Sequence, residues 1–405
     1  MIEILPHYKH KKGDDILALY LKMVAAVVPF YPKDILGENV SFVRRARMRK
    51  KEYRALLKEY LTKDYPEFEQ FHKSKQDALL AQKLIYDYSK ELYDFLYDGV
   101  DSKTGNVNHD NLIELLTFKM PGGILPEKMD DFRADAESRE TDASKRAEKK
   151  KKLLKWVFPY DKFASHEDIY QLLQLLDVEV CPYCNRQCIT TVSTKKRHTR
   201  PQLDHFKNKS DYPFLALSIN NLVPCCGVCN LLKQDKDKKI LYPYSEGMNS
   251  MYTFKAKDKN GQYTELCTGV DIGPDNFEID LEKGAGDANA LNRAENTIDM
   301  FALRELYQSH KPYVASLYKM RYIYTEKLCE DFLTQCPEAF SKILSMKPID
   351  GILRNLEEKE QIKAAAAYLK TMLLLINYQP ENWTKTPLAK LTYDISREID
   401  ALNTK

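Results

Sequence analysis

Two pairs of cysteines near the middle of the chain constrain its fold more than any other feature. The pairs have CxxC spacing and are separated by 41 residues; they consist of Cys181, Cys184, Cys226 and Cys229. Thiolates at this spacing on tight turns occupy two corners of a zinc tetrahedron, and a second pair completes it. The alternative is a set of buried free cysteines, but Pro182, Tyr183 and Gly227 suit turns better than a packed core. The sequence therefore predicts a structural Zn²⁺ site.

The cysteine count argues against a disulfide framework. The chain has nine cysteines, an odd number in a long chain, and six of them fall between positions 181 and 229. Clustering of this kind in a reducing compartment points to metal. Cys188 and Cys225 remain outside the two pairs, and we interpret them as spare thiols near the site. Cys225 could compete with Cys226 as a ligand, but only Cys226 has the two-residue gap to Cys229.

The length and composition predict several helical regions around the cysteine-rich segment. A chain of 405 residues exceeds one ordinary domain, and a hydrophobic fraction of 43% excludes a mainly disordered protein. Only 14 glycines favour helices over a Rossmann-type fold. The predicted fold is α+β and mainly α-helical. Its predicted parts are a helical N-terminal domain (1–140), a basic helix or linker (141–178), a central module (179–245), a β-hairpin extension (246–290) and a helical C-terminal region (291–405).

No segment of the sequence has the character of a membrane span or a secretory signal. The best apolar candidate, 16–30, is interrupted by Lys22. The first residues, MIEILPHYKHKKGDD, lack the order of a basic start, an apolar run and a small-residue cleavage site. We therefore expect no membrane association and a cytoplasmic protein. The chain also lacks the GxxxxGK[ST] element, so it carries no P-loop ATPase of its own.

Periodicity places individual elements in these regions. Apolar residues at helical spacing predict helices within 16–28, 77–97 and 358–378, and one or two helices after 292 that break near Lys311-Pro312. The segment 252–267 has Asn260-Gly261 between two alternating runs, which predicts a hairpin with a type I′ turn.

Polar side chains between the cysteine pairs and directly after the second pair have the chemistry of a metal-dependent hydrolase. In PQLDHF (201–206) a strand-like approach ends in Asp204-His205, and Asn230 directly follows Cys229. A carboxylate and a carboxamide oxygen are hard ligands suited to Mg²⁺ or Mn²⁺. His205 would point to the other side of the strand, exposed in a catalytic groove with little packing. An imidazole there could take a proton from water.

The motifs of this segment follow one another in the order CPYC, LDHF, NNLVPCCGVCN and then Lys233. This order resembles that of the zinc-stabilised branch of the HNH nucleases, which have the ββα-metal fold. The third motif position, often His in that family, is Asn230 here, as in its HNN variant. The resemblance implies that His205 is the general base, that Asp204 and Asn230 hold the catalytic metal, and that Asn221 braces the loop holding the base. It also places Lys233 where such proteins often have a lysine facing phosphate, and we count Arg200 and Lys207 with it as nucleic-acid-binding residues.

The segment DHFKNKSDYPFLALSINNL is further similar to HNH proteins of the Septu and retron-associated anti-phage systems of bacteria. The segment NRAENTIDMFALRELY resembles their helical tail. This similarity implies a defence nuclease gated by a regulatory protein partner, an ATPase and possibly a reverse transcriptase. Residues 1–140 resemble no family.

The local charge agrees with a nucleic-acid substrate. Residues 181–240 contain eleven Lys and Arg against four Asp, a net charge of +7, in a chain whose overall net charge is only +3. Such a basic module is what binding to a phosphate backbone requires. Two further basic runs, 44–54 and 144–155, are either solvated helix faces or surfaces that contact DNA or an acidic partner.

These observations favour a metal-dependent HNH endonuclease that hydrolyses DNA phosphodiester bonds. The alternative is a non-catalytic zinc module that binds nucleic acid or a partner protein. A zinc module of that kind has no need of Asp204, His205 and Asn230 in this order. RNA remains a further possible substrate, since no sequence feature excludes it.

Overall fold

The computed structural model describes residues 1–6, 9–29, 67, 70–101, 103–133, 153–236, 238–258, 273–344, 357–373, 380 and 383–403. Within these ranges the protein is α+β and mainly helical, with small two-stranded sheets, as the sequence predicts. The basic run 44–54, residues 144–152 of the second basic run and the predicted Asn260-Gly261 turn lie outside them. No helix in the described ranges is long and apolar enough to cross a membrane.

The chain divides into two compact units. The first unit comprises residues 3–183 and 188–247, and the second comprises residues 1–2, 184–187 and 248–405. The finer division into five regions stays a prediction.

The N-terminal part of the first unit is helical. Its helices are α1 (Gly13–Val27), α3 (Lys73–Tyr88), α4 (Lys90–Leu96), α5 (His109–Thr117), α6 (Glu127–Asp130), α8 (Tyr160–Ala164) and α9 (Ile169–Leu176). The helix predicted within 16–28 is confirmed by α1. The stretch 77–97 forms two helices because Ser89 adopts an extended conformation and its Oγ accepts a hydrogen bond from the backbone N–H of Leu92, which caps α4.

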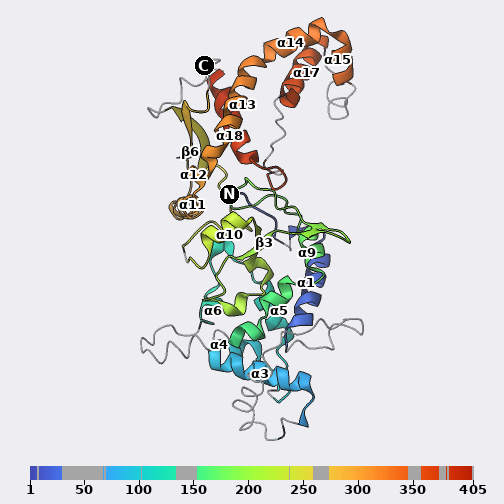
Figure 1. Ribbon diagram of the computed structural model, residues 1–405, viewed down its shortest axis with the longest axis vertical. Coiled ribbons are helices and arrows are strands. Elements are labelled where there is room, and N and C mark those ends of the chain that lie inside the picture. The colour runs from blue at the N-terminus through green and yellow to red at the C-terminus, as the bar shows by residue number, and fades with distance from the viewer. Residues whose placement is uncertain are drawn as a thin grey trace. The chain divides into compact units, whose positions relative to one another are not determined.

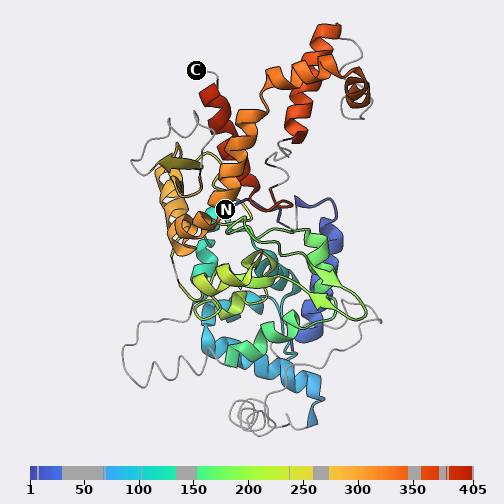
Figure 2. The same ribbon diagram turned by 45° about the horizontal axis from the view of Figure 1, so that its top comes forward.

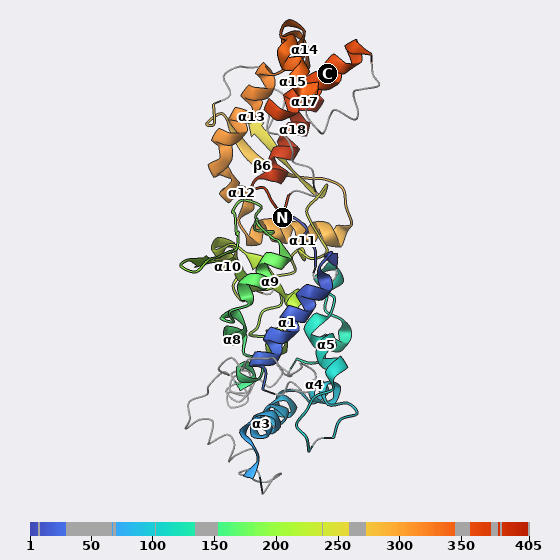
Figure 3. The same cartoon turned by 90° about the vertical axis from the view of Figure 1, so that its right-hand side faces the viewer.

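The N-terminal helices hold the segment 215–221 of the same unit. Helix α1 packs against α8 and α9 (Figures 1 and 3), and the Tyr20 hydroxyl on α1 donates to the carbonyl of Leu217. Ser218 Oγ donates to the carbonyl of Leu115 at 2.8 Å. Asn220 Nδ2 donates to the carbonyls of Thr117 and Phe118, at 3.0 and 2.8 Å. The helices predicted as a separate domain therefore supply partners for a loop of the central module.

The central segment of the first unit forms a strand–strand–helix arrangement. Strands β3 (Gln202–His205) and β4 (Leu222–Cys225) are antiparallel, and Asp204 lies opposite Val223 in their register. The connection between them contains two short 3₁₀ turns, η5 (Pro213–Leu215) and η6 (Ile219–Asn221). Helix α10 (Gly227–Lys233) follows β4 and contacts β3. Ahead of β3 lies a short ribbon formed by β1 (Val192–Ser193) and β2 (His198–Thr199).

The second unit contains a sheet covered by helices. Strands β5 (Tyr252–Asp258) and β6 (Phe277–Lys283) are antiparallel over seven residue pairs, and α18 (Ala389–Asn403) packs on β5. The predicted first hairpin strand is thus confirmed by β5. Its partner among the described residues is β6, and the run 262–267 lies outside them.

The remaining helices of the second unit follow the predicted helical tail. They are α11 (Ala288–Met300), α12 (Leu303–Tyr307), α13 (Lys311–Ile323), α14 (Glu326–Gln335), α15 (Pro337–Leu344) and α17 (Glu358–Leu373). Pro312 lies in the first turn of α13, where its missing N–H costs nothing, and a 3₁₀ turn at Gln308–His310 separates α13 from α12. Helices α14, α15 and α17 lie together (Figure 2). They share a small core that includes Leu333.

The two hydrogen bonds of Asn220 generate a stability prediction. Asn220→Ala removes both bonds to the carbonyls of Thr117 and Phe118 in a side chain that is only 2% exposed. We expect it to lower the free energy of unfolding by about 2 kcal/mol, at about 1 kcal/mol for each bond. The measurement is urea unfolding followed by far-UV circular dichroism. Asn106→Ala, at an exposed position of the same unit, is the control. An equal loss of unfolding free energy in both variants would contradict a stabilising role for the two Asn220 hydrogen bonds.

Candidate functional site

The four cysteines of the two CxxC pairs converge on one point. Cys181, Cys184, Cys226 and Cys229 are all buried, and their sulfur atoms lie within 4.8 Å of one another. Tetrahedral zinc with Zn–S bonds of ~2.3 Å requires four sulfurs in such a cluster. The four cysteines could therefore hold a metal ion such as zinc, as the sequence predicts.

The flanking structure accounts for this convergence. Residues 182–184 form a turn, and Cys226 is the N-cap of α10, with its Sγ accepting from the backbone N–H of Cys229 at 3.5 Å. The other two cysteines of the segment lie outside the cluster. Cys188 is exposed, and Cys225 is buried on β4, where burial and the nearby Asp204 carboxylate raise the pKa of its thiol well above the usual value. Cys225 lies outside the group of four sulfurs, in agreement with its interpretation as a spare thiol.

Asp204 lies on β3 and is almost completely buried, with 4% of its surface exposed. Its carboxylate accepts a hydrogen bond from the Tyr183 hydroxyl at 2.7 Å and forms an ion pair with Lys233 Nζ at 3.1 Å. Burial raises the pKa of Asp204, while the Lys233 charge and the Tyr183 hydrogen bond oppose that rise. Tyr183 belongs to the first CxxC turn, so the turn that carries two cysteines also holds this carboxylate.

Lys233 does not lie where the sequence analysis places it. Its side chain is only 2% exposed, and its ammonium also donates to the carbonyl of His205 at 2.7 Å. We predicted a lysine that faces phosphate, but a cation buried between Asp204 and the backbone of β3 is not a surface contact. The physical reason is that the buried Asp204 carboxylate needs a counter-charge, and the last turn of α10 supplies it.

His205 follows Asp204 and is oriented by the backbone. Its Nε2 lies 3.1 Å from the carbonyl oxygen of Ala216, and a carbonyl only accepts, so Nε2 carries the proton and Nδ1 has the lone pair. The ring also makes an edge contact with Tyr160, with centroids 4.4 Å apart. Burial, together with Lys209 and Lys233, lowers the pKa of His205 to about 3. The imidazole is therefore neutral at physiological pH.

The expectation of an exposed histidine with little packing is wrong. His205 is 8% exposed and is held by the Ala216 carbonyl on one side and Tyr160 on the other. The loop after β3 folds back over the ring, which a pattern of strand residues could not indicate.

Asn221 makes the hydrogen bonds that fix this loop. Its side chain is fully buried, and its Oδ1 accepts from the backbone N–H of Lys207 at 2.7 Å. Its Nδ2 donates to the carbonyls of Lys207 and Leu215, both at 3.1 Å. The two ends of the loop that carries Ala216 are thereby tied together, next to the hydrogen bond that orients His205.

Asn230 lies on α10 beside a residue that the sequence analysis did not single out. Its Nδ2 donates to Gln202 Oε1 at 2.8 Å. Gln202 stands two positions before Asp204 on β3, and alternation along a strand places both on one face. The alternation of side chains along this strand is the sequence signal that could have identified Gln202 as a site residue. The bond also sets the amide of Asn230 so that its Oδ1 is the atom left for another partner.

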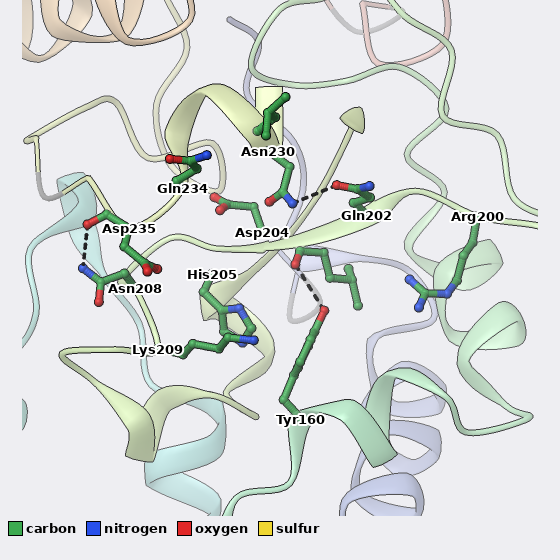
Figure 4. Close-up of a pocket in the computed structure, with 12 residues that line it drawn as sticks. Tyr160, Arg200, Gln202, Asp204, His205, Asn208, Lys209, Asn230, Gln234 and Asp235 are labelled. Carbon is green, nitrogen blue, oxygen red and sulfur yellow. Dashed lines mark hydrogen bonds between the residues drawn. The ribbon is translucent and has the colours of Figure 1, made fainter. Parts of the chain in front are cut away.

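Asp204, His205 and Asn230 line one cavity of about 600 Å³ (Figure 4). Its walls include Asp204, His205, Asn230 and Gln202, together with Tyr160, Asn208, Asp235 and the cations of Arg200 and Lys209. Arg200 donates to the carbonyls of Pro201 and Ala164, at 3.0 Å each. Lys207 is half-buried and is not among the lining residues. Lys209, which the sequence analysis did not select, lies above the Tyr160 ring at 5.0 Å.

Comparisons with known proteins do not identify this arrangement. No protein-family model matches the chain, and neither the curated proteins nor the solved structures contain a match. The interpretation of the cavity therefore depends on its own geometry and chemistry.

The cysteine cluster generates a metal-content prediction. Cys229→Ser removes one ligand and should lower the bound zinc by at least tenfold, as measured by elemental analysis after dialysis. The first unit should then melt at lower temperature, because the binding energy of a structural metal is part of the folding energy. Cys188→Ser is the matched control, since Cys188 is exposed and outside the cluster. Unchanged zinc in Cys229→Ser would contradict the assignment.

The hydrogen bond from Tyr183 to Asp204 generates a second prediction. Tyr183→Phe removes only the hydroxyl that donates to the carboxylate. We predict from the sequence that Asp204 holds a divalent ion, and the loss of a bond that orients such a carboxylate should lower Mn²⁺ affinity by about tenfold. Titration of the zinc-loaded protein with Mn²⁺, followed by electron paramagnetic resonance, measures this directly. Zinc content should be unchanged, and an unaltered Mn²⁺ affinity would show that the bond has a purely structural role.

Proposed function

We propose that the protein is a metal-dependent endonuclease of the HNH type that hydrolyses DNA phosphodiester bonds. One observation carries this proposal. A neutral imidazole with its proton fixed on Nε2, a buried carboxylate and a carboxamide line the same cavity of a strand–strand–helix unit. These are the groups that hydrolysis of a phosphodiester by an activated water requires.

His205 is the general base in this proposal. Its Nδ1 lone pair takes a proton from water, and the Ala216 carbonyl then accepts a stronger hydrogen bond from the imidazolium Nε2–H. Tyr160 and the loop tied by Asn221 hold the ring in place. The pKa of about 3 keeps the base unprotonated at neutral pH, although so low a value also limits its proton affinity.

Asp204 and Asn230 are the residues that would hold Mg²⁺ or Mn²⁺. A carboxylate oxygen and an amide oxygen are the hard donors these ions prefer, and both residues line the cavity. When bound, the divalent ion supplies positive charge for the phosphoryl oxygen and the leaving oxygen. Because Lys233 balances the charge of Asp204, the two residues alone attract a cation weakly, and substrate phosphate is expected to complete the site.

The charge of the surroundings supports a polyanionic substrate. Arg200 and Lys209 line the cavity, and residues 181–240 carry the net charge of +7. The sequence similarity to HNH proteins of anti-phage systems supports a defence role gated by a regulatory partner, an ATPase and possibly a reverse transcriptase.

One observation favours the alternative of a non-catalytic zinc module. Both oxygens of Asp204 already have partners, Tyr183 and Lys233, so the carboxylate does not require a metal for its own stability. A zinc-loaded protein that binds nucleic acid but never cleaves it in Mg²⁺ or Mn²⁺, with or without candidate partners, would establish this alternative.

The test of the base uses His205→Gln. Glutamine can keep the hydrogen bond to the Ala216 carbonyl through its amide N–H, but it cannot accept a proton from water. We expect plasmid cleavage in Mg²⁺ to fall by at least ~100-fold, the size of a general-base contribution, with unchanged zinc content. His109→Ala, on α5 and away from the cavity residues, should cleave normally. Cleavage by His205→Gln at the original rate would remove His205 from this role.

The test of the carboxylate requires a double substitution. Asp204→Asn alone would leave the Lys233 ammonium buried without a counter-charge and could cost several kcal/mol. Asp204→Asn with Lys233→Met removes both charges together. We expect this variant to retain zinc but to lose Mg²⁺-dependent cleavage, and cleavage that persists in it would exclude Asp204 as the metal ligand.

A further inference from the structure

The β1–β2 ribbon of the first unit is exposed along its whole length. Each residue from 192 to 199 is exposed, and the ring of His198 approaches Tyr170 on α9. Val192, with 40% of its surface in solvent, is one of the exposed large apolar side chains of the described residues. A two-stranded hairpin that buries neither face is marginal in water. Such a ribbon gains stability when a partner covers it.

The tip of the ribbon holds three cations in a fixed turn. The backbone N–H of Thr194 donates to the Arg197 carbonyl at 2.9 Å, and Thr194 Oγ1 accepts from the backbone N–H groups of Lys196 and Arg197. Lys195, Lys196 and Arg197 therefore project from a turn whose bonds do not involve their side chains. In the part of the chain that the structure describes, no carboxylate forms an ion pair with any of the three.

The ribbon leads directly into the cavity. After Thr199 the chain passes through Arg200, which lines the cavity, and enters β3 with Asp204 and His205. The ribbon lies beside α9: His198, in the pair next to the turn, has its ring 5.2 Å from the Tyr170 ring. Asp204 lies seven positions after Arg197, a span of at most roughly 23 Å at a strand rise of ~3.3 Å per residue. This span equals about seven base pairs of B-form DNA at ~3.4 Å per step.

We infer that residues 192–199 form a DNA-binding ribbon that enters the major groove of a B-form duplex, with Lys195, Lys196 and Arg197 on the phosphates at its edge. The major groove of B-DNA admits a two-stranded ribbon, whereas the deep, narrow major groove of A-form RNA does not. The inference deepens the proposed function by naming duplex DNA as the substrate class. Binding of the duplex by the ribbon is independent of the proposed function, and only cleavage of the bound duplex rests on it.

The experiment measures binding separately from cleavage. The full-length, zinc-loaded chain with Lys195→Gln, Lys196→Gln and Arg197→Gln is compared with the unaltered chain, without added divalent ions, by fluorescence anisotropy on a 20-base-pair DNA duplex. The loss of three phosphate contacts should reduce the slope of log K against log salt by about 2.7, at ~0.9 per contact. The turn should persist because its hydrogen bonds come from the backbone and Thr194.

The control carries the same change of charge elsewhere on the first unit. Lys73, Lys90 and Lys103 are exposed on or beside α3 and α4, and their replacement by Gln should leave the salt slope unchanged. Zinc content and far-UV circular dichroism verify that both triple variants are folded. An unchanged slope in the ribbon variant, or an equal change in the control, would overturn the inference.

Two further measurements identify the groove and the nucleic acid. Methylation of guanine N7, which lies in the major groove, should weaken binding by the unaltered chain more than binding by the ribbon variant. Single-stranded DNA and double-stranded RNA of the same sequence should compete poorly; equal competition by either would overturn the assignment to duplex DNA. If the ribbon governs duplex binding but the chain cleaves nothing, the ribbon stands and the proposed nuclease fails. If the chain cleaves DNA and the ribbon variant cleaves it equally well, the proposed nuclease stands and the DNA-binding role of the ribbon fails.

Discussion

The buried charge of Asp204 is the constraint around which the centre of the first unit is arranged. A carboxylate that is 4% exposed requires compensation, which comes from the Tyr183 hydroxyl and the Lys233 ammonium. Tyr183 lies in the turn of the first cysteine pair, and Lys233 lies on the helix that begins at the second. The interaction therefore fixes both cysteine-bearing segments relative to β3, and a metal ion on the four sulfurs would fix the same segments from the other side.

The two neighbours on β3 are held in opposite electrostatic states. Burial disfavours the charged form of both groups; the Lys233 cation and the Tyr183 hydroxyl oppose this effect at Asp204, whereas nearby cations add to it at His205. Both side chains line the same cavity but have different hydrogen-bond partners, so one strand segment presents a paired carboxylate and a neutral imidazole to it. Titratable groups perturbed by burial and by neighbouring charges are typical of functional sites, and they also occur in structural ion pairs.

Much of this centre is predictable from the sequence, and the failures have identifiable causes. The cysteine spacing predicts the sulfur cluster, and the apolar run after Asp14-Asp15 predicts α1, because both signals are local. The burial of His205 and the position of Lys233 depend on how the loop 206–221 folds over β3, which no local pattern encodes. The pairing of β5 with β6 is not predicted from the sequence, because β6 lies beyond the expected turn and strand pairing across that distance leaves no local signature.

The cavity and the ribbon differ in how their charged side chains are compensated. At the cavity wall, Asp204 is compensated by the buried Lys233 within the fold, so the positions of both are set before any ligand arrives. On the ribbon, Lys195, Lys196 and Arg197 stay in solvent at no desolvation cost, and only a polyanion would bring them counter-charge. Binding through exposed cations releases counterions and is sensitive to salt, whereas a buried ion pair is not. Salt should therefore act on substrate capture by the ribbon and leave the geometry of the cavity unaffected.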